Sequence, residues 1–149
     1  MDFARLRLGE LSSAAAALAL LVTLFLDWNR DSGAGAQSGW SSLGLVMLAL
    51  VVVTIALALA LAFTTAVKRP AAIPVGAAVL TTGAGIIVTP VLAIRVLFLG
   101  DSLGFAHFGL LLMLLIPVGS WIAMADERTD APYSAAPDLP RRPVPPAEA

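Results

Sequence analysis

The chain has 149 residues, of which 59% are hydrophobic and 13% are charged, and its formal net charge is −1. Soluble domains carry about 25% charged residues, so this composition indicates a membrane protein, and a net charge near zero gives no general attraction to nucleic acid. The sequence has no cysteine and one histidine, which excludes disulfides, thiol catalysis and cysteine-ligated metals and argues against a histidine metal site.

The first hydrophobic segment follows a short basic start. Residues 1–10 (MDFARLRLGE) are expected to form a cytoplasmic N-terminus, and the uncharged run after them ends at Asp27 and Trp28. We predict a first transmembrane span over about 11–27, with Trp28 at the level of the lipid headgroups. A cleaved signal peptide is the alternative, because 34–36 (AGA) has the small-x-small form of a cleavage site. That site lies beyond three charged residues, which favours an uncleaved span.

The loop from 27 to 42 (DWNRDSGAGAQSGWSS) is polar and rich in glycine and serine. Its small polar side chains cannot build a core, so we expect a mobile cap unless a contact pins it. Trp28 and Trp40 stand at its two ends, where aromatic residues of a membrane interface are expected.

Two long apolar runs then flank the basic pair Lys68-Arg69. They predict a second span over about 43–63 and a third over about 71–95, joined as a transmembrane hairpin. Pro90 should bend the third span because it cannot bond the carbonyl of Ile86. The adjacent hydroxyl of Thr89 is a candidate to satisfy the freed backbone.

The fourth span is predicted over about 105–124, with Pro117 in its second half and Trp121 at the far interface. The expected transmembrane domain is therefore an all-α, four-helix bundle over 11–125. Residues 126–149 are proline-rich and are predicted to form a disordered cytoplasmic tail. The PxxP pattern within 140–146 is either a docking motif for a proline-binding partner or part of a solvated tail.

The distribution of Lys and Arg predicts the orientation. With the N-terminus inside, seven basic residues lie on the inner side and two on the outer side, which is a clear positive-inside bias. We therefore expect a multi-pass protein of a bacterial cell membrane with both termini in the cytoplasm. The inner residues are Arg5, Arg7, Lys68, Arg69, Arg128, Arg141 and Arg142, and the outer ones are Arg30 and Arg95.

Small residues recur at helical spacing in three of the spans. Helices in lipid associate through close contact at small residues, so these stripes are expected to face the bundle interior. The alternatives are that an alanine-rich composition produces them by chance, or that they serve self-association. The predicted packing residues are Ala16 and Ala19 in the first span, Ala58 and Ala62 in the second, and Ala78, Thr82 and Gly85 in the third.

No Asp, Glu, Lys or Arg lies in the middle of any predicted span. Proton-coupled carriers need such a group, so its absence argues against them and against small multidrug transporters. The missing cysteines exclude four-helix quinone-linked thiol oxidoreductases and tight-junction proteins with a paired-cysteine loop. The hydroxyls of Thr81, Thr82 and Thr89 either line a polar path or bond within the bundle.

Polar residues gather instead at the predicted outer edge. They form either a small ligand or ion site or a set of surface ion pairs worth about 0–1 kcal/mol, and the second interpretation is favoured. Arg95 is expected to pair with Asp101 or Asp27, and His107 is either a pH sensor or an amphipathic anchor. The cluster is Asp27, Arg30, Asp31, Arg95, Asp101 and His107.

Three stretches carry a family resemblance: 24–28 (LFLDW), 38–42 (SGWSS) and 119–128 (GSWIAMADER). In these motifs the chain resembles a group of small, uncharacterised four-helix membrane proteins of actinobacteria. It departs from them at 27–29 (DWN), where they often have Pro-Trp-Tyr-like residues, and at its entry to the fourth span. The resemblance implies the architecture and no activity.

The sequence therefore predicts a non-enzymatic integral membrane protein without a cofactor. We expect it to act through helix or loop contacts with the lipid bilayer and with a membrane-protein partner or a second copy, and not with nucleic acid. The alternative is a small transporter or channel subunit whose path is lined by the third span in an oligomer.

Overall fold

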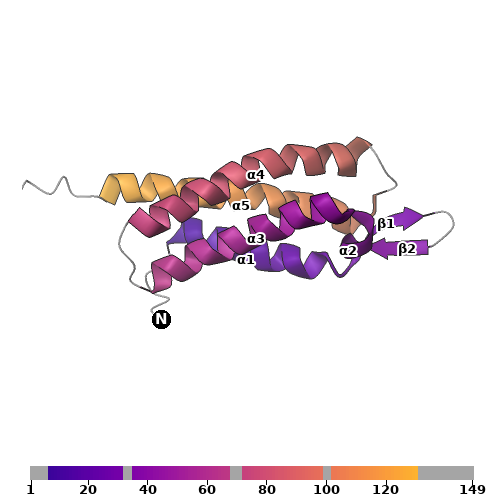
Figure 1. Cartoon of the computed structure of the whole chain (residues 1–149), viewed down its shortest axis with the longest axis horizontal. Helices are drawn as coiled ribbons and strands as arrows, with labels where there is room; N and C mark the ends of the chain where they lie inside the picture. Colours follow the sequence, from indigo (N-terminus) through magenta and orange to yellow (C-terminus); the bar gives the residue numbers. More distant parts are fainter. Residues whose placement is uncertain (1–6, 32–34, 68–71, 99–101, 131–149) are drawn as a thin grey trace, which may run out of the picture.

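The computed structural model describes residues 7–31, 35–67, 72–98 and 102–130. Its long elements are antiparallel helices that form an elongated bundle, and a small β-hairpin lies at one end (Figure 1). We refer to this end as the hairpin end and to the other as the opposite end. The elements are α1 (Leu8–Thr23), β1 (Asp27–Asp31), β2 (Gly35–Ser38), α2 (Gly39–Ser42), α3 (Leu45–Ala66), α4 (Ala72–Phe98) and α5 (Gly104–Asp130).

Three of these helices are long and apolar enough to cross a bilayer by length and composition: Leu45–Ala66, Ile73–Phe98 and Gly104–Ala125. The shorter apolar helix α1 has 16 residues and a length of about 24 Å, against a hydrocarbon core of about 30 Å. Helix α1 differs from the predicted first span over about 11–27 at both ends, because it begins at Leu8 and ends at Thr23. The chain leaves the helix after Thr23, and β1 begins at Asp27.

The other helix bounds lie close to the predicted spans, with one extension. Helix α5 continues past Met124 to Asp130, into the segment that we assigned to the tail. Residues 131–149, with the predicted PxxP motif, lie outside the described residues. Helix α4 is continuous through Pro90, and the predicted bend at this residue stays a prediction.

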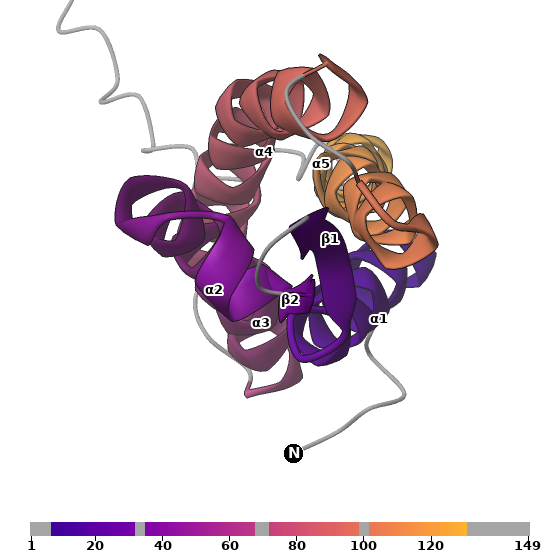
Figure 2. The same ribbon diagram turned by 90° about the vertical axis from the view of Figure 1, so that its right-hand side faces the viewer.

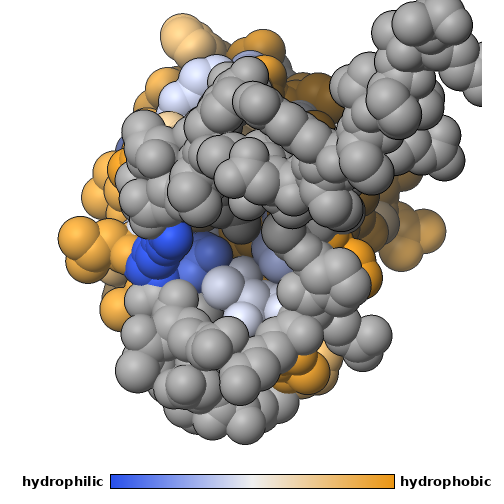
Figure 3. All heavy atoms as spheres, turned by 90° about the vertical axis from the view of Figure 1, so that its left-hand side faces the viewer, coloured by the Kyte–Doolittle hydropathy of each residue, from blue (hydrophilic) through white to orange (hydrophobic). Residues whose placement is uncertain are grey.

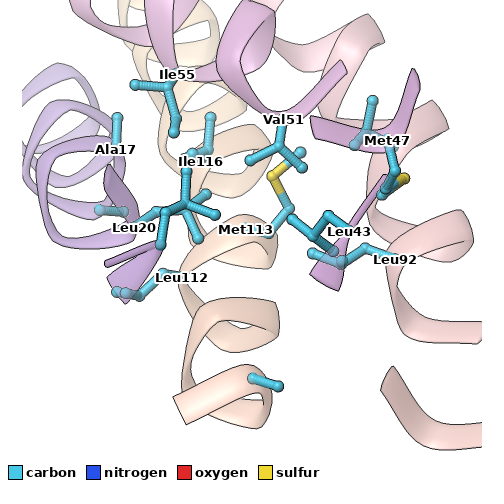
Figure 4. Packing of buried hydrophobic residues seen from close by; sticks show 14 of the residues in the cluster. Ala17, Leu20, Leu43, Met47, Val51, Ile55, Leu92, Leu112, Met113 and Ile116 are labelled. Carbon is cyan, nitrogen blue, oxygen red and sulfur yellow. The ribbon is translucent and has the colours of Figure 1, made fainter. Parts of the chain in front are cut away.

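The four long helices are arranged in a ring in the order α1, α3, α4, α5, and each contacts its two neighbours. Figure 2 shows this ring from the hairpin end, where the hairpin and α2 lie across the end of the bundle. The core at its centre is apolar: Leu20 of α1, Val51 of α3, Leu92 of α4 and Met113 of α5 are 0% exposed. Figure 4 shows these side chains converging from their four helices.

The outside of the bundle is apolar as well. Large hydrophobic side chains such as Leu18, Val46, Ile87 and Leu115 are between 41% and 75% exposed. Such a surface is unfavourable in water and suits lipid, where helices need no polar outer face. The view from the opposite end shows hydrophobic side chains along the flanks and a hydrophilic patch between them (Figure 3).

The close approach of α1 and α5 depends on glycine at the opposite end. A Cβ added to Gly9 would lie 2.5 Å from the backbone nitrogen of Ala123, and one added to Gly119 would lie 2.8 Å from the carbonyl of Gly9. Larger residues could not occupy these positions without moving the helices apart. The hydroxyl of Ser13 also donates to the carbonyl of Ile116 across this interface, at 3.1 Å.

A buried carboxylate lies next to this interface. Glu10, which we placed outside the first span, is 2% exposed in the first turn of α1. Its Oε2 accepts from the backbone N–H of Arg7 at 3.0 Å, and its Oε1 accepts from the hydroxyl of Thr65 at 3.0 Å. The carboxylate thereby caps α1 and ties it to the last turn of α3.

Candidate functional site at the hairpin end

Trp28 is the anchor of the hairpin end. Its side chain is 2% exposed, and its Nε1 donates to the carbonyl of Thr23 at 2.6 Å. Two glycines make room for the ring, since a Cβ on Gly109 would overlap it and one on Gly39 would lie 3.1 Å from it. The ring therefore fills a slot between α5 and α2 and does not face the surroundings of the bundle, and the predicted level of Trp28 at the lipid headgroups stays a prediction.

Trp40, at the other end of the same loop, is placed differently. It is 37% exposed, and its ring lies 5.4 Å from that of Phe25 at an interplanar angle of 57°. Its backbone N–H donates to the carbonyl of Leu24 at 3.3 Å, which holds α2 against the end of α1.

The loop between these tryptophans is folded rather than a mobile cap. Strand β1 pairs with β2 in an antiparallel hairpin, in which Arg30 lies opposite Ala36. The strand is also attached to the segment before α5: Asn29 forms an isolated bridge with Ser102, and Leu103 donates its N–H to the carbonyl of Trp28 at 2.8 Å. These contacts and the buried Trp28 fix the hairpin on the bundle.

A small polar cavity lies beneath β1. It has a volume of about 30 Å³, is partly open, and is lined by β1, the end of α2, the C-terminal part of α4 and the segment leading into α5 with the start of that helix. Arg95 of α4 is half-buried, and its Nη2 donates to the carbonyl of Ser42. The Oδ1 of Asn29 is buried and has no hydrogen-bond partner. The lining residues are Trp28, Asn29, Ser42, Leu43, Arg95, Val96, Ser102 and Ala106.

Among the described residues of the predicted outer cluster, only Arg95 lines this cavity. Asp27, Arg30 and His107 are exposed, and the Nδ1 of His107 lies 3.2 Å from the carbonyl of Leu103 in its own helix. Asp31 belongs to β1, but its side chain and the whole of Asp101 lie outside the described residues.

The sequence predicts that Arg95 pairs with Asp101 or Asp27. The structure shows no ion pair with Asp27, and the guanidinium bonds the Ser42 carbonyl. A pairing with Asp101 stays a prediction, because that residue lies outside the described residues. Asn29, Ser42 and Ser102, which we did not single out, complete the polar lining of the cavity. They carry no signal in the sequence, because they come from β1, the end of α2 and the segment before α5, which only the tertiary fold brings together.

The residues of the predicted packing stripes are buried to different degrees. Ala16, Ala58 and Ala78 are 4%, 0% and 1% exposed, Thr82 is 5% exposed, and Gly85 is buried. Ala19 and Ala62 are half-buried.

The hydroxyls on α4 are all hydrogen-bonded within the protein. Thr82 bonds the hydroxyl of Ser120 in α5 at 2.8 Å, and Thr89 donates to the carbonyl of Met113 at 3.4 Å. Thr81 donates to the carbonyl of Ala77 in its own helix at 2.8 Å. From its position beside Pro90, we expected the Thr89 hydroxyl to satisfy the freed carbonyl of Ile86. It bonds the carbonyl of Met113 in α5 instead.

A wider apolar groove lies on the outer side of the α4–α5 contact. Its volume is about 430 Å³, and it is lined by Thr82, Gly85, Ile86, Thr89 and Pro90 of α4 and by Leu114, Pro117, Val118, Trp121 and Ile122 of α5. Trp121 is 62% exposed at its rim. Among the described residues, no group of three His, Asp or Glu side chains gathers to hold a metal ion.

No family model, no curated protein and no solved structure matches this chain. The resemblance to actinobacterial four-helix proteins therefore depends on the three sequence motifs alone.

Proposed function

We propose that this protein is a non-enzymatic integral membrane protein that acts by contact, through the polar surface of its β-hairpin, with a partner at the membrane. The observation that carries the proposal is the fixed hairpin: Trp28 is buried to 2% exposure in a loop that its composition alone would leave mobile. A chain that needed only to connect two helices would not require this anchor.

A fixed surface favours recognition for a thermodynamic reason. A mobile loop loses conformational entropy when it binds, whereas a preorganised one has already lost it during folding. The charged residues Asp27 and Arg30 of β1 are exposed on such a surface here, and Trp40 of α2 is exposed as well.

The orientation of the chain supports a partner on the outer side. The excess of Lys and Arg in the terminal segments and in the segment between α3 and α4 favours a cytoplasmic location for these segments, by the positive-inside rule. The hairpin would then project from the outer face of a cell membrane, while the apolar flanks of the bundle contact lipid.

A path through the third span has less support. The hydroxyls of Thr81, Thr82 and Thr89 are engaged with the protein itself, so none of them is directed at a permeating solute. An oligomer would have to break these bonds or build a path from other groups.

Site-specific photo-crosslinking in intact cells tests the proposal. A photoreactive residue at Arg30 should give a discrete protein adduct, whereas the same residue at Val79, which is half exposed on α4 far from the hairpin, should not. Adding Trp28→Ala to the first variant should reduce the adduct, because the hairpin loses its anchor. Equal adducts at both positions, or solute flux through proteoliposomes of the purified protein, would overturn the proposal.

A further inference from the structure

We propose that the cavity beneath β1 is a binding site for one small inorganic anion of about the size of chloride. This inference is independent of the contact function, because it concerns the space beneath β1 and not the outer surface of the hairpin. It follows from the charge, the polar lining and the volume of the cavity.

Arg95 supplies the charge. Its guanidinium carries several N–H donors, of which one bonds the carbonyl of Ser42. Among the described residues, no carboxylate lines the cavity. A partly buried cation is costly unless it is paired, so the site favours a ligand that brings a negative charge.

The start of α5 adds to the positive electrostatic potential that Arg95 creates in the cavity. Ala106 lies in the first turn of a helix of 27 residues and lines the cavity. The N-terminus of a helix carries a partial positive charge, and this dipole favours an anion at that position. The helix terminus and the guanidinium therefore both make the electrostatic potential in the cavity more positive.

Asn29 supplies a polar group without a partner. Its buried Oδ1 accepts no hydrogen bond, although the oxygen and nitrogen ends of an amide exchange places when the group is turned over. With an anion in the cavity, the amide turns its Nδ2 inward and donates to it. The oxygen then faces the outer side of β1, where it can bond water.

The volume limits the class of ligand. A cavity of about 30 Å³ holds particles no larger than one or two water molecules. Phosphate, carboxylic acids and organic solutes are too large to lie wholly within this space, whereas a halide ion fits in it. A metal cation is disfavoured by Arg95.

Thermal unfolding in detergent tests the site. At equal ionic strength, the protein should unfold at a higher temperature in sodium chloride than in sodium gluconate, whose anion is too large to enter, by on the order of 2–4 °C. Arg95→Gln should abolish this difference. Arg30→Gln is the matched control: it removes an exposed arginine at the same end of the bundle and should leave the difference intact.

Fluorescence gives a second measurement that does not depend on the stability of the arginine variant. Trp28 lines the cavity, and in a Trp40→Phe/Trp121→Phe protein it is the sole remaining tryptophan. Bromide should quench its emission in a saturable way, and chloride should compete. Quenching that rises linearly without competition, or a chloride effect on unfolding that persists in Arg95→Gln, would show that the cavity holds solvent only and would overturn the proposal.

Discussion

Gly85 of α4 lies directly against the ring of Pro117 in α5. A Cβ added to Gly85 would be 2.6 Å from the Pro117 Cβ, so the two helices approach at this level as closely as their backbones permit. Proline lacks the N–H that would bond the carbonyl of Met113 within α5. The hydroxyl of Thr89, one turn further along α4, donates to that same carbonyl at 3.4 Å. The break in α5 is therefore compensated from α4.

Alanine substitutions at Gly85 and Gly83 can be compared directly, because both residues lie in the same helix. A Cβ on Gly83 meets no atom within 4 Å. Gly83→Ala should leave the free energy of unfolding unchanged or raise it by up to about 1 kcal/mol, since alanine is the better helix former. Gly85→Ala should lower it by about 1–3 kcal/mol through overpacking against Pro117. Unfolding in mixed micelles measures both, and equal stability of the two variants would contradict the close approach of α4 and α5.

The compensation of Pro117 by Thr89 predicts an energetic coupling between these residues. Thr89→Val should destabilise the protein by about 0.6–1.7 kcal/mol, as is usual for a hydrogen bond between membrane helices. In a Pro117→Ala background the same change should cost less, because the introduced alanine has a backbone N–H that restores the bond to the carbonyl of Met113. A double-mutant cycle on unfolding free energies isolates this term. Thr81→Val serves as the control, since Thr81 bonds within its own helix and should show no coupling to Pro117.

The long helices could be predicted from the sequence because length and apolar composition are local properties. The runs over 43–63 and 71–95 correspond to α3 and α4, and the small-residue stripes include Gly85, which lies against Pro117. The polar loop was harder to predict. Its hairpin forms because a tryptophan finds a slot bounded by Gly39 and Gly109, and Gly109 is far away in the sequence.

The buried carboxylate illustrates a second limit. Glu10 stands at the start of the first apolar run, where a charged residue is expected to face water. Its burial depends on Thr65, which arrives from the end of another helix, and on the close contact of Gly9 with Gly119. The same holds for the cavity beneath β1, because its polar groups come from separate parts of the chain. Hydropathy along one segment contains no information on either arrangement.

Trp28 should determine whether the hairpin is ordered. Trp28→Ala removes a fully buried aromatic ring and should lower the free energy of unfolding by about 3–5 kcal/mol. It should also make the segment 27–42 accessible to proteases under conditions in which the unchanged protein is resistant. Trp40→Ala is the control, because Trp40 is 37% exposed and its ring lies at a tilted angle to that of Phe25. Similar protease sensitivity of the two variants would contradict the role of Trp28 as the anchor.

Thr65 and Thr64 provide a matched pair for testing the buried carboxylate at the opposite end. Both are half-buried, and both donate to the carbonyl of Leu61, at 3.1 Å and 2.9 Å respectively. Only Thr65 also reaches Glu10. Thr65→Val leaves one oxygen of a buried charge without its donor, and it should cost about 1.5–3 kcal/mol, the range for hydrogen bonds to charged groups. Thr64→Val lacks this term and should cost clearly less. Because the Glu10 carboxylate is the cause, the difference between the two valine variants should disappear in a Glu10→Ala background. The free energy of unfolding is measured in parallel on all these variants. If Thr65→Val and Thr64→Val still differ in the Glu10→Ala background, the effect comes from packing at the end of α3 and not from the carboxylate.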